Sequence, residues 1–179
     1  AYQLKITPEI FYLDVQSGVK LVRYIEGAET LNNATIQYMN HIEKVIMVLR
    51  TLHTSGVRFN NDFNVFKEIE IYEELLGRVK GWMYEGYSEL RPSIFALADR
   101  LNQLGVTLTP CHNDLVAENF VKGLDGKIHL IDWEYSGMND PYGIWLLYLL
   151  KVLFQKRICR GLYYCIMIII FPPVFHRKF

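Results

Sequence analysis

The chain has 179 residues, 51% of them hydrophobic, with 19 basic and 19 acidic side chains. A chain of this length can bury a core of its own, and its balanced charge argues against a nucleic-acid-binding protein. Three cysteines without Cys-x-x-Cys spacing, and no recognisable signal peptide, are typical of a cytoplasmic protein with free thiols. The absence of an initiator methionine suggests that residues are missing upstream.

The first predicted elements are two strands joined by a turn. Residues 9–15 are rich in β-forming side chains, residues 16–18 carry the turn glycine, and residues 19–25 alternate again. Residues 26–28 then break the pattern, which predicts that the chain leaves the sheet there.

A long helix is predicted next. Apolar residues recur at helical spacing over residues 34–54, and Asn32 or Asn33 can provide the N-cap. His53 lies in the last turn of this helix, where we interpret it as a partner of the helix dipole rather than as a ligand.

The second half of the chain combines helices with a short hairpin. Helical stretches with mixed apolar and charged faces cover about residues 63–79 and 88–104, and Pro110 follows them. Residues 124–126 form a hairpin-type turn before a predicted apolar strand over residues 127–132.

Two polar motifs flank this hairpin. The first is Cys-His112-Asn-Asp114 followed by four residues and Asn119, and the second begins at Asp132 after the apolar strand. Phosphoryl transfer needs a carboxylate that orients the attacking hydroxyl, and oxygen ligands that hold Mg²⁺ on nucleotide phosphates. We therefore predict Asp114 as the catalytic base, and Asn119 and Asp132 as metal ligands. A carboxylate at the end of a buried strand is costly unless a cation pairs with it.

Neighbouring residues are given supporting roles. His112 is expected to brace the loop by hydrogen bonds rather than to react. Glu134 lies two residues after Asp132, so on an extended stretch it would point the same way and could support a second Mg²⁺ or an ammonium substrate. Tyr135 adds an aromatic face for a quaternary ammonium group, whereas core packing is the favoured explanation of Trp133. Each residue alone has an ordinary structural explanation, and only the joint spacing favours a site.

Together with the hinge-like segment Val22-Arg-Tyr-Ile-Glu-Gly27, these motifs resemble the choline/ethanolamine kinase family over about residues 5–141. The resemblance implies an α+β, protein-kinase-like fold of the choline kinase and aminoglycoside phosphotransferase type. It also implies ATP as the donor, Mg²⁺ as the cofactor and choline or ethanolamine as the acceptor. The hinge residues that would hold the adenine edge are Arg23, Tyr24 and Ile25.

The resemblance divides the chain into three parts. Residues 1–27 would be the end of an N-lobe sheet with the hinge, residues 28–141 a mainly helical C-lobe, and residues 142–179 an apolar tail. The phosphate-covering loop and the strand lysine of the family are absent upstream, so we expect this fragment alone to be inactive.

The tail departs from the family pattern directly after Pro141. The family continues at this point with Trp-Asp-Leu-Ala. Residues 142–152 can be back-translated into codons whose neighbouring reading frame encodes that sequence. This favours a one-nucleotide frame shift near Pro141. A membrane segment is the alternative, but charged residues interrupt each apolar run before the roughly 20 residues that a span requires. We therefore expect no stable membrane span.

Two other functions stay open. The chain could be a non-catalytic remnant that binds nucleotide or metal without transfer. It could also belong to an antibiotic kinase of the aminoglycoside type, against which the Glu134-Tyr135 pair argues. The sequence leaves the oligomeric state undefined, and no nucleic-acid partner is expected.

Overall fold

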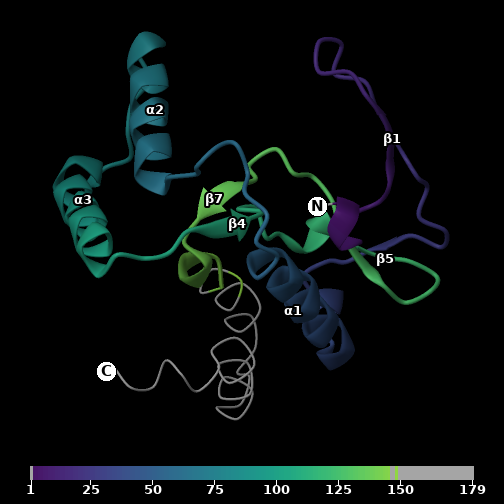
Figure 1. The fold of residues 1–179 in the computed structure, drawn as a ribbon. Coiled ribbons are helices and arrows are strands. Elements are labelled where there is room, and N and C mark those ends of the chain that lie inside the picture. The colour runs from purple at the N-terminus through teal and green to yellow at the C-terminus, as the bar shows by residue number, and fades with distance from the viewer. Residues whose placement is uncertain (1, 146–147, 149–179) are drawn as a thin grey trace, which may run out of the picture.

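The computed structural model describes residues 2–145 and 148 (Figure 1). Most of the predicted apolar tail therefore lies outside the described residues. In the described part of the chain, no helix has both the length and the apolar character needed to cross a bilayer. The strands and helices in chain order are β1 (Ile10–Leu13), β2 (Lys20–Val22), β3 (Glu29–Thr30), α1 (Met39–His53), α2 (Val65–Arg78), α3 (Tyr87–Leu104), β4 (Thr109–Cys111), β5 (Phe120–Lys122), β6 (Ile128–Leu130) and β7 (Gly137–Asn139). Short 3₁₀ turns occur at Tyr2–Leu4, Thr35–Gln37 and Ala117–Asn119.

The predicted N-terminal hairpin is present, with shorter strands than expected. β1 and β2 pair antiparallel with an irregularity in register between Ile10 and Tyr12, and Gly18 occupies the left-handed region with φ +72° in the turn. Every residue of both strands is exposed, and the hairpin extends away from the rest of the fold in Figure 1. It meets the remainder of the fold mainly through the segments that enter and leave it.

The long helix starts later than predicted. The side-chain oxygen of Asn32 accepts backbone hydrogen bonds from Ala34 (2.9 Å) and Thr35 (3.0 Å), so Asn32 stabilises the 3₁₀ turn rather than capping α1. Tyr38 then has an extended backbone, with ψ 133°, and α1 begins at Met39. Of the apolar residues whose spacing predicted the helix, Met39 is 51% exposed, and the others are buried: Ile36, Ile42, Ile46, Leu49 and Leu52.

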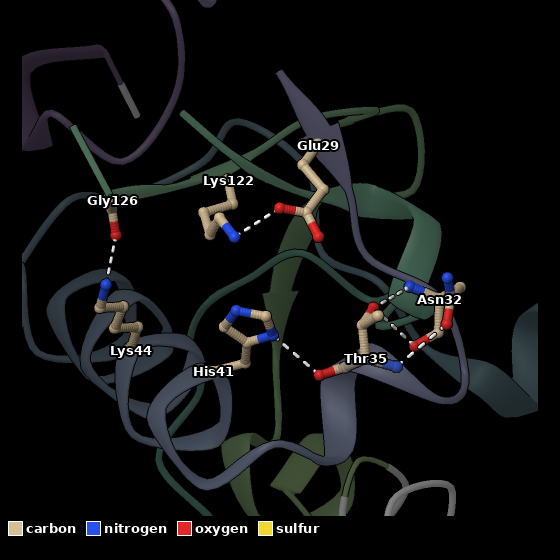
Figure 2. Close-up of polar contacts among 7 residues, drawn as sticks. All are labelled: Glu29, Asn32, Thr35, His41, Lys44, Lys122 and Gly126. Carbon is tan, nitrogen blue, oxygen red and sulfur yellow. Dashed lines mark hydrogen bonds and ion pairs between the residues drawn. The ribbon is translucent and has the colours of Figure 1, made fainter. Parts of the chain in front are cut away.

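Polar contacts attach the β5–β6 hairpin to α1 and to the segment after the hinge (Figure 2). Lys44 of α1 donates from Nζ to the Gly126 carbonyl at 2.5 Å, and Lys122 of β5 forms an ion pair with Glu29 of β3. The His41 ring hydrogen-bonds through Nδ1 to the Thr35 carbonyl at 2.8 Å. These contacts hold the strands that carry the two polar motifs in a fixed position over α1.

Three short strands, β3, β4 and β7, were not predicted, whereas β5 and β6 form the predicted hairpin. β3, β5 and β6 form one antiparallel sheet in the order β3-β5-β6, and β4 pairs antiparallel with β7. Each has two or three residues, too few to show the alternation from which strands are recognised. The apolar strand predicted over residues 127–132 is β6, and its pairing ends at Leu130.

Helices α2 and α3 form an arm on the other side of the β4–β7 pair from α1 (Figure 1). Asn64 caps α2, and Gly105, with φ +63°, ends α3. Neither helix buries a residue, and they meet through an aromatic contact between Phe66 and Phe95 as well as through polar contacts. Glu73 of α2 accepts hydrogen bonds from the Arg91 guanidinium at 2.5 and 2.8 Å and from the Tyr87 hydroxyl at 2.7 Å. The hydrogen bond from Arg91 is the largest cause of the Glu73 pKa, which is lowered to about 2.

Candidate functional site

Strand pairing places the two polar motifs side by side. Cys111 at the end of β4 pairs with Gly137 at the start of β7, and Phe120 at the start of β5 pairs with Leu130 at the end of β6. The loop of residues 112–119 and the loop of residues 131–136 therefore run alongside each other between the same two pairs of strands. We call them the catalytic loop and the metal loop, after the roles predicted for Asp114 and Asp132.

His112 connects the two loops from a fully buried position. Its Nδ1 accepts the backbone N–H of Asp114 at 3.3 Å, so the proton lies on Nε2, which donates to the Ile131 carbonyl at 2.8 Å. Burial lowers the His112 pKa, while the hydrogen bond to Ile131 acts in the opposite direction. The ring of Trp133 packs edge-on against it, with centroids 4.9 Å apart. A buried, neutral imidazole in one tautomer is suited to holding the loops together.

Asp114 and Asn119 are joined directly. The Asn119 amide nitrogen Nδ2 donates to Asp114 Oδ2 at 3.0 Å and to the Asp114 carbonyl at 2.9 Å. Because the nitrogen end of the amide is used in this way, its oxygen Oδ1 is the end that can face a cation. The backbone carbonyl of Asn119 accepts the N–H of Ile131 at 3.0 Å, which brings Asn119 next to the residue before Asp132.

Asp132 is not at the end of a buried strand as predicted. The strand ends at Leu130, and Asp132 is exposed with φ +62°, in the left-handed region that few non-glycine residues adopt. This carboxylate is therefore solvated, and the prediction that it is buried at a cost is wrong. Among the described residues, Lys5, Lys80 and Asn113 are the other non-glycine residues with positive φ, and of these only Asn113, with φ +69°, lies in the two loops.

The extended stretch from which Glu134 was predicted to point the same way as Asp132 is also absent. Residues 133–136 form a turn in which the Ser136 N–H donates to the Trp133 carbonyl at 3.1 Å, so this stretch is not extended. Within the described residues, no group of three or more His, Cys, Asp or Glu side chains is arranged to hold a metal. Oxygen donors of Asn119 and Asp132 nevertheless suit Mg²⁺, which in such sites takes one or two protein ligands and completes its shell with phosphate and water.

Tyr135 lies among acidic groups. The Glu134 carboxylate is the largest cause of its raised pKa, followed by Tyr72, burial and Asp114. Its side chain is 42% exposed, so the phenol keeps contact with solvent. Trp133, by contrast, donates from Nε1 to the Leu130 carbonyl at 3.0 Å and packs on Phe59, which is the packing role that was favoured for it.

The hinge residues line a separate cavity. Arg23, Tyr24 and Ile25 contribute to a space of about 610 Å³ between the entry to β1, the exit of β2 and the β5–β6 turn. The guanidinium of Arg23 is paired with Glu9 at 2.6 Å. The residues that line this cavity do not include the predicted catalytic and metal residues of the two loops.

Three asparagines for which no role was predicted hold the metal loop in place. Asn113 donates to the Tyr135 carbonyl at 2.8 Å, Asn139 donates to Asn113 Oδ1 at 2.9 Å, and Asn61 donates to the Ser136 carbonyl at 2.7 Å. Asn113 and Asn139 lie inside or beside the motifs, but Asn61 lies 75 positions away from Ser136 in the chain. Local spacing gives no signal for such a contact.

Gly137 is expected to tolerate no side chain. A Cβ there would lie 2.9 Å from Asn61 Nδ2 and 3.0 Å from the backbone nitrogen of Phe63. Gly137→Ala should therefore lower the free energy of unfolding by about 1–3 kcal/mol, measured by urea denaturation. In the matched control Gly77→Ala, a Cβ in α2 meets nothing within 4 Å, and we expect a gain of about 0.5–1 kcal/mol. A Gly137→Ala variant as stable as the wild-type chain would contradict this close approach.

Comparison with known proteins gives consistent results. Residues 10–142 match the family described as Choline/ethanolamine kinase. Protein LicA of Haemophilus influenzae is 39% identical over 143 residues, which are 79% of this chain and 52% of that protein. A crystal structure of the choline kinase LicA from Streptococcus pneumoniae superposes with a TM-score of 0.77 and 32% identity, covering 94% of this chain and 57% of that one.

A structure of LicA in complex with AMP is similarly close, with a TM-score of 0.76, 33% identity and coverage of 94% of this chain and 56% of that one. The chain thus spans about half the length of the relatives it matches. The predicted α+β, protein-kinase-like fold is confirmed by these likenesses.

Proposed function

The chain belongs to the choline/ethanolamine kinase family, and from this premise we propose that its two loops are the phosphotransfer site of an ATP-dependent choline kinase. The observation that carries the proposal is the link between Asp114 and Asn119. An amide that donates to the carboxylate at 3.0 Å fixes the carboxylate in one orientation, as a group that receives a hydroxyl proton requires.

In this proposal Asp114 orients the choline hydroxyl and accepts its proton during in-line transfer of the γ-phosphoryl group. His112 keeps the catalytic loop in register with the metal loop through its two hydrogen bonds. Asn119 and Asp132 would hold Mg²⁺, which supplies neutralisation of phosphate charge when it is bound. The hinge residues Arg23, Tyr24 and Ile25 are proposed to hold the nucleotide, and the AMP complex of a relative supports a nucleotide partner.

Choline is favoured as the acceptor by the surroundings of Tyr135. A quaternary ammonium group has no hydrogen-bond donor and is recognised through aromatic faces and negative charge. Tyr135 offers the aromatic face, and the carboxylates of Glu134 and Asp114 act on it from nearby. Ethanolamine is the alternative acceptor, because the same carboxylates can bind its primary ammonium group.

The acceptor can be tested in a chimera that supplies the parts absent from this chain. Residues 10–140 would replace the matching segment of the Streptococcus pneumoniae choline kinase, and ADP release would be followed with choline, ethanolamine and an aminoglycoside. We expect the highest kcat/KM with choline. A preference for the aminoglycoside would overturn the choice of acceptor, and release of ADP independent of any acceptor would favour a remnant without transfer activity.

This chain on its own is proposed to give no measurable turnover, since it spans about half the length of its relatives. The measurement is coupled ADP release with choline and Mg²⁺ in excess. Clear turnover that disappears in Asp114→Ala would contradict the expectation of an inactive fragment while supporting the assignment of the site.

A further inference from the structure

The segment after the hinge leads directly to the strand that follows the catalytic loop. Glu29 comes soon after Ile25, the last hinge residue, and begins β3. β3 pairs antiparallel with β5, which begins at Phe120 directly after Asn119. The pairing of β3 with β5 is therefore a short connection between the hinge and Asn119, the predicted metal ligand of the catalytic loop.

The backbone alone positions β5 only coarsely along β3, because the pairing involves only two residues of β3. Val121 of β5 is 5% exposed, and a slip by a whole residue, about 3.3 Å, would turn it to the opposite face of the sheet. Burial thus excludes a full slip but not a smaller displacement. The ligands of a metal ion must be placed to within about 0.2 Å, so Asn119 needs a finer restraint than burial provides.

Lys122 and Glu29 provide such a restraint through their side chains (Figure 2). They are direct partners in the β3–β5 pairing, and the Lys122 ammonium forms an ion pair with the Glu29 carboxylate. The hydrogen bond from Lys122 is the largest cause of the lowered Glu29 pKa, so the carboxylate stays ionised at neutral pH. Their side chains are 29% and 49% exposed, and ion pairs at such exposure contribute little to the free energy of unfolding. The effect we infer is therefore on position rather than on stability.

The turn of the β5–β6 hairpin is fixed to the same segment and to α1. Leu124 donates its backbone N–H to the Glu26 carbonyl at 2.8 Å, and Gly27, with φ +61°, lies so close that a Cβ there would be 3.0 Å from the Leu124 Cβ. From α1, Lys44 donates to the Gly126 carbonyl at 2.5 Å (Figure 2). With its turn held in this way, β5 is attached to the end of the hinge, and the pair of Lys122 with Glu29 lies between that attachment and Asn119.

We propose that Lys122 is a positioning residue, whose ion pair with Glu29 sets Asn119 at the distance from the hinge at which one nucleotide can contact both. This inference rests on the proposed function, because it needs a nucleotide at the hinge and a metal ion at Asn119. Neither Lys122 nor Glu29 is among the residues that line the hinge cavity. Lys122 should therefore affect binding that uses the hinge and the metal ligand together, and leave binding at the hinge alone unchanged.

Two nucleotide probes separate these cases in calorimetric titrations of the full chain. Adenosine reports binding at the hinge alone, and ADP with and without Mg²⁺ reports the gain in affinity that the metal ligands contribute. We expect Lys122→Met and Glu29→Gln each to lower this gain by about 3- to 10-fold, up to the lower end of the effect of residues that orient metal ligands. The affinity for adenosine should stay unchanged.

Arg78→Met is the matched control, because it removes an ion pair with Glu74 that lies on α2 and is 2.6 Å long. The gain with Mg²⁺ should stay unchanged in this variant. A rescue variant completes the set: Glu29→Lys combined with Lys122→Glu exchanges the two charges and should recover most of the gain that Glu29→Lys alone loses. Glu29→Gln keeps the size of a half-exposed side chain, so it carries the test if Lys122→Met does not fold.

The outcomes separate this inference from the proposed function. A wild-type gain with Mg²⁺ that persists in Lys122→Met or Glu29→Gln overturns the role of Lys122 and leaves the proposed site intact. A wild-type chain without any gain overturns both. Losses that extend equally to adenosine or to Arg78→Met, or that the exchanged pair does not reverse, also overturn the inference, because they would show a general effect on the fold.

Discussion

Asp114→Asn is expected to lower kcat for choline phosphorylation by about 10²- to 10⁴-fold in the chimera that carries residues 10–140 of this chain. A positioned general base contributes a factor of this size, and asparagine keeps the shape of the side chain while it loses the ability to accept the hydroxyl proton. The hydrogen bond from Asn119 Nδ2, at 3.0 Å in the wild-type chain, can still be accepted by the amide oxygen of the new residue. The substitution therefore tests chemistry rather than folding, and KM for choline should change much less than kcat.

The matched control is Asp99→Asn on the exposed surface of α3, which should leave kcat unchanged. Both variants would be measured by coupled ADP release at saturating ATP and Mg²⁺. Turnover of Asp114→Asn within a factor of about 3 of the parent chimera would remove Asp114 from the position of catalytic base.

The second large effect concerns His53 and the stability of the fold. His53 is buried at the end of α1 against the edge of the Trp145 ring, and neither ring nitrogen has a hydrogen-bond partner among the described residues. Burial lowers its pKa from 6.5 to about 4. The sequence-based interpretation of His53 as a charged partner of the helix dipole is therefore wrong, because the folded protein holds this imidazole neutral.

The direction of the pH effect follows from this lowered pKa. Below pH 6.5 the unfolded chain binds a proton at His53 that the folded chain takes up only near pH 4, so stability falls as the pH falls through this window. The lowering of the His53 pKa from 6.5 to about 4 reduces the free energy of unfolding by about 3 kcal/mol at a pH below both values. At pH 5 the reduction is about 2 kcal/mol.

His53→Leu should remove this contribution and cost little at neutral pH, because an unpaired buried polar group is replaced by an apolar one. The measurement is the free energy of unfolding in urea at pH 7.5 and pH 5 for both proteins. We expect the variant to gain about 2 kcal/mol relative to the wild type between these two pH values. An identical loss in both proteins would show that His53 is not the group that titrates.

Long, periodic elements could be predicted from the sequence, and short paired ones could not. The apolar spacing from Ile42 to Leu52 indicated α1 because burial on one helix face imposes that spacing. Its start was missed by five residues, since the Asn32 side chain stabilises a separate 3₁₀ turn and Tyr38 interrupts the helix. Strands such as β3 and β7 exist through pairing with distant segments, and two or three residues carry no pattern of their own.

In the candidate site, too, local sequence patterns could be interpreted and contacts between distant segments could not. Residue type and spacing were sufficient to select Asp114, Asn119 and Asp132, whose assignments stay proposals. The alignment of Glu134 with Asp132 was predicted for an extended stretch, and the structure has a turn at residues 133–136 instead. The contribution of Asn61 depends on where the segment before α2 lies relative to the metal loop, and that position is set by tertiary contacts.

The central claim is that Asn119 and Asp132 hold Mg²⁺ for a nucleotide, and the Mg²⁺ dependence of ADP binding to this chain tests it most directly. Calorimetric titration with and without Mg²⁺ should show tighter binding in the presence of the metal. Asp132→Asn should remove that increment, while binding in the absence of the metal stays as it was. An affinity for ADP that is the same with and without Mg²⁺, or an increment that persists in Asp132→Asn, would contradict the account.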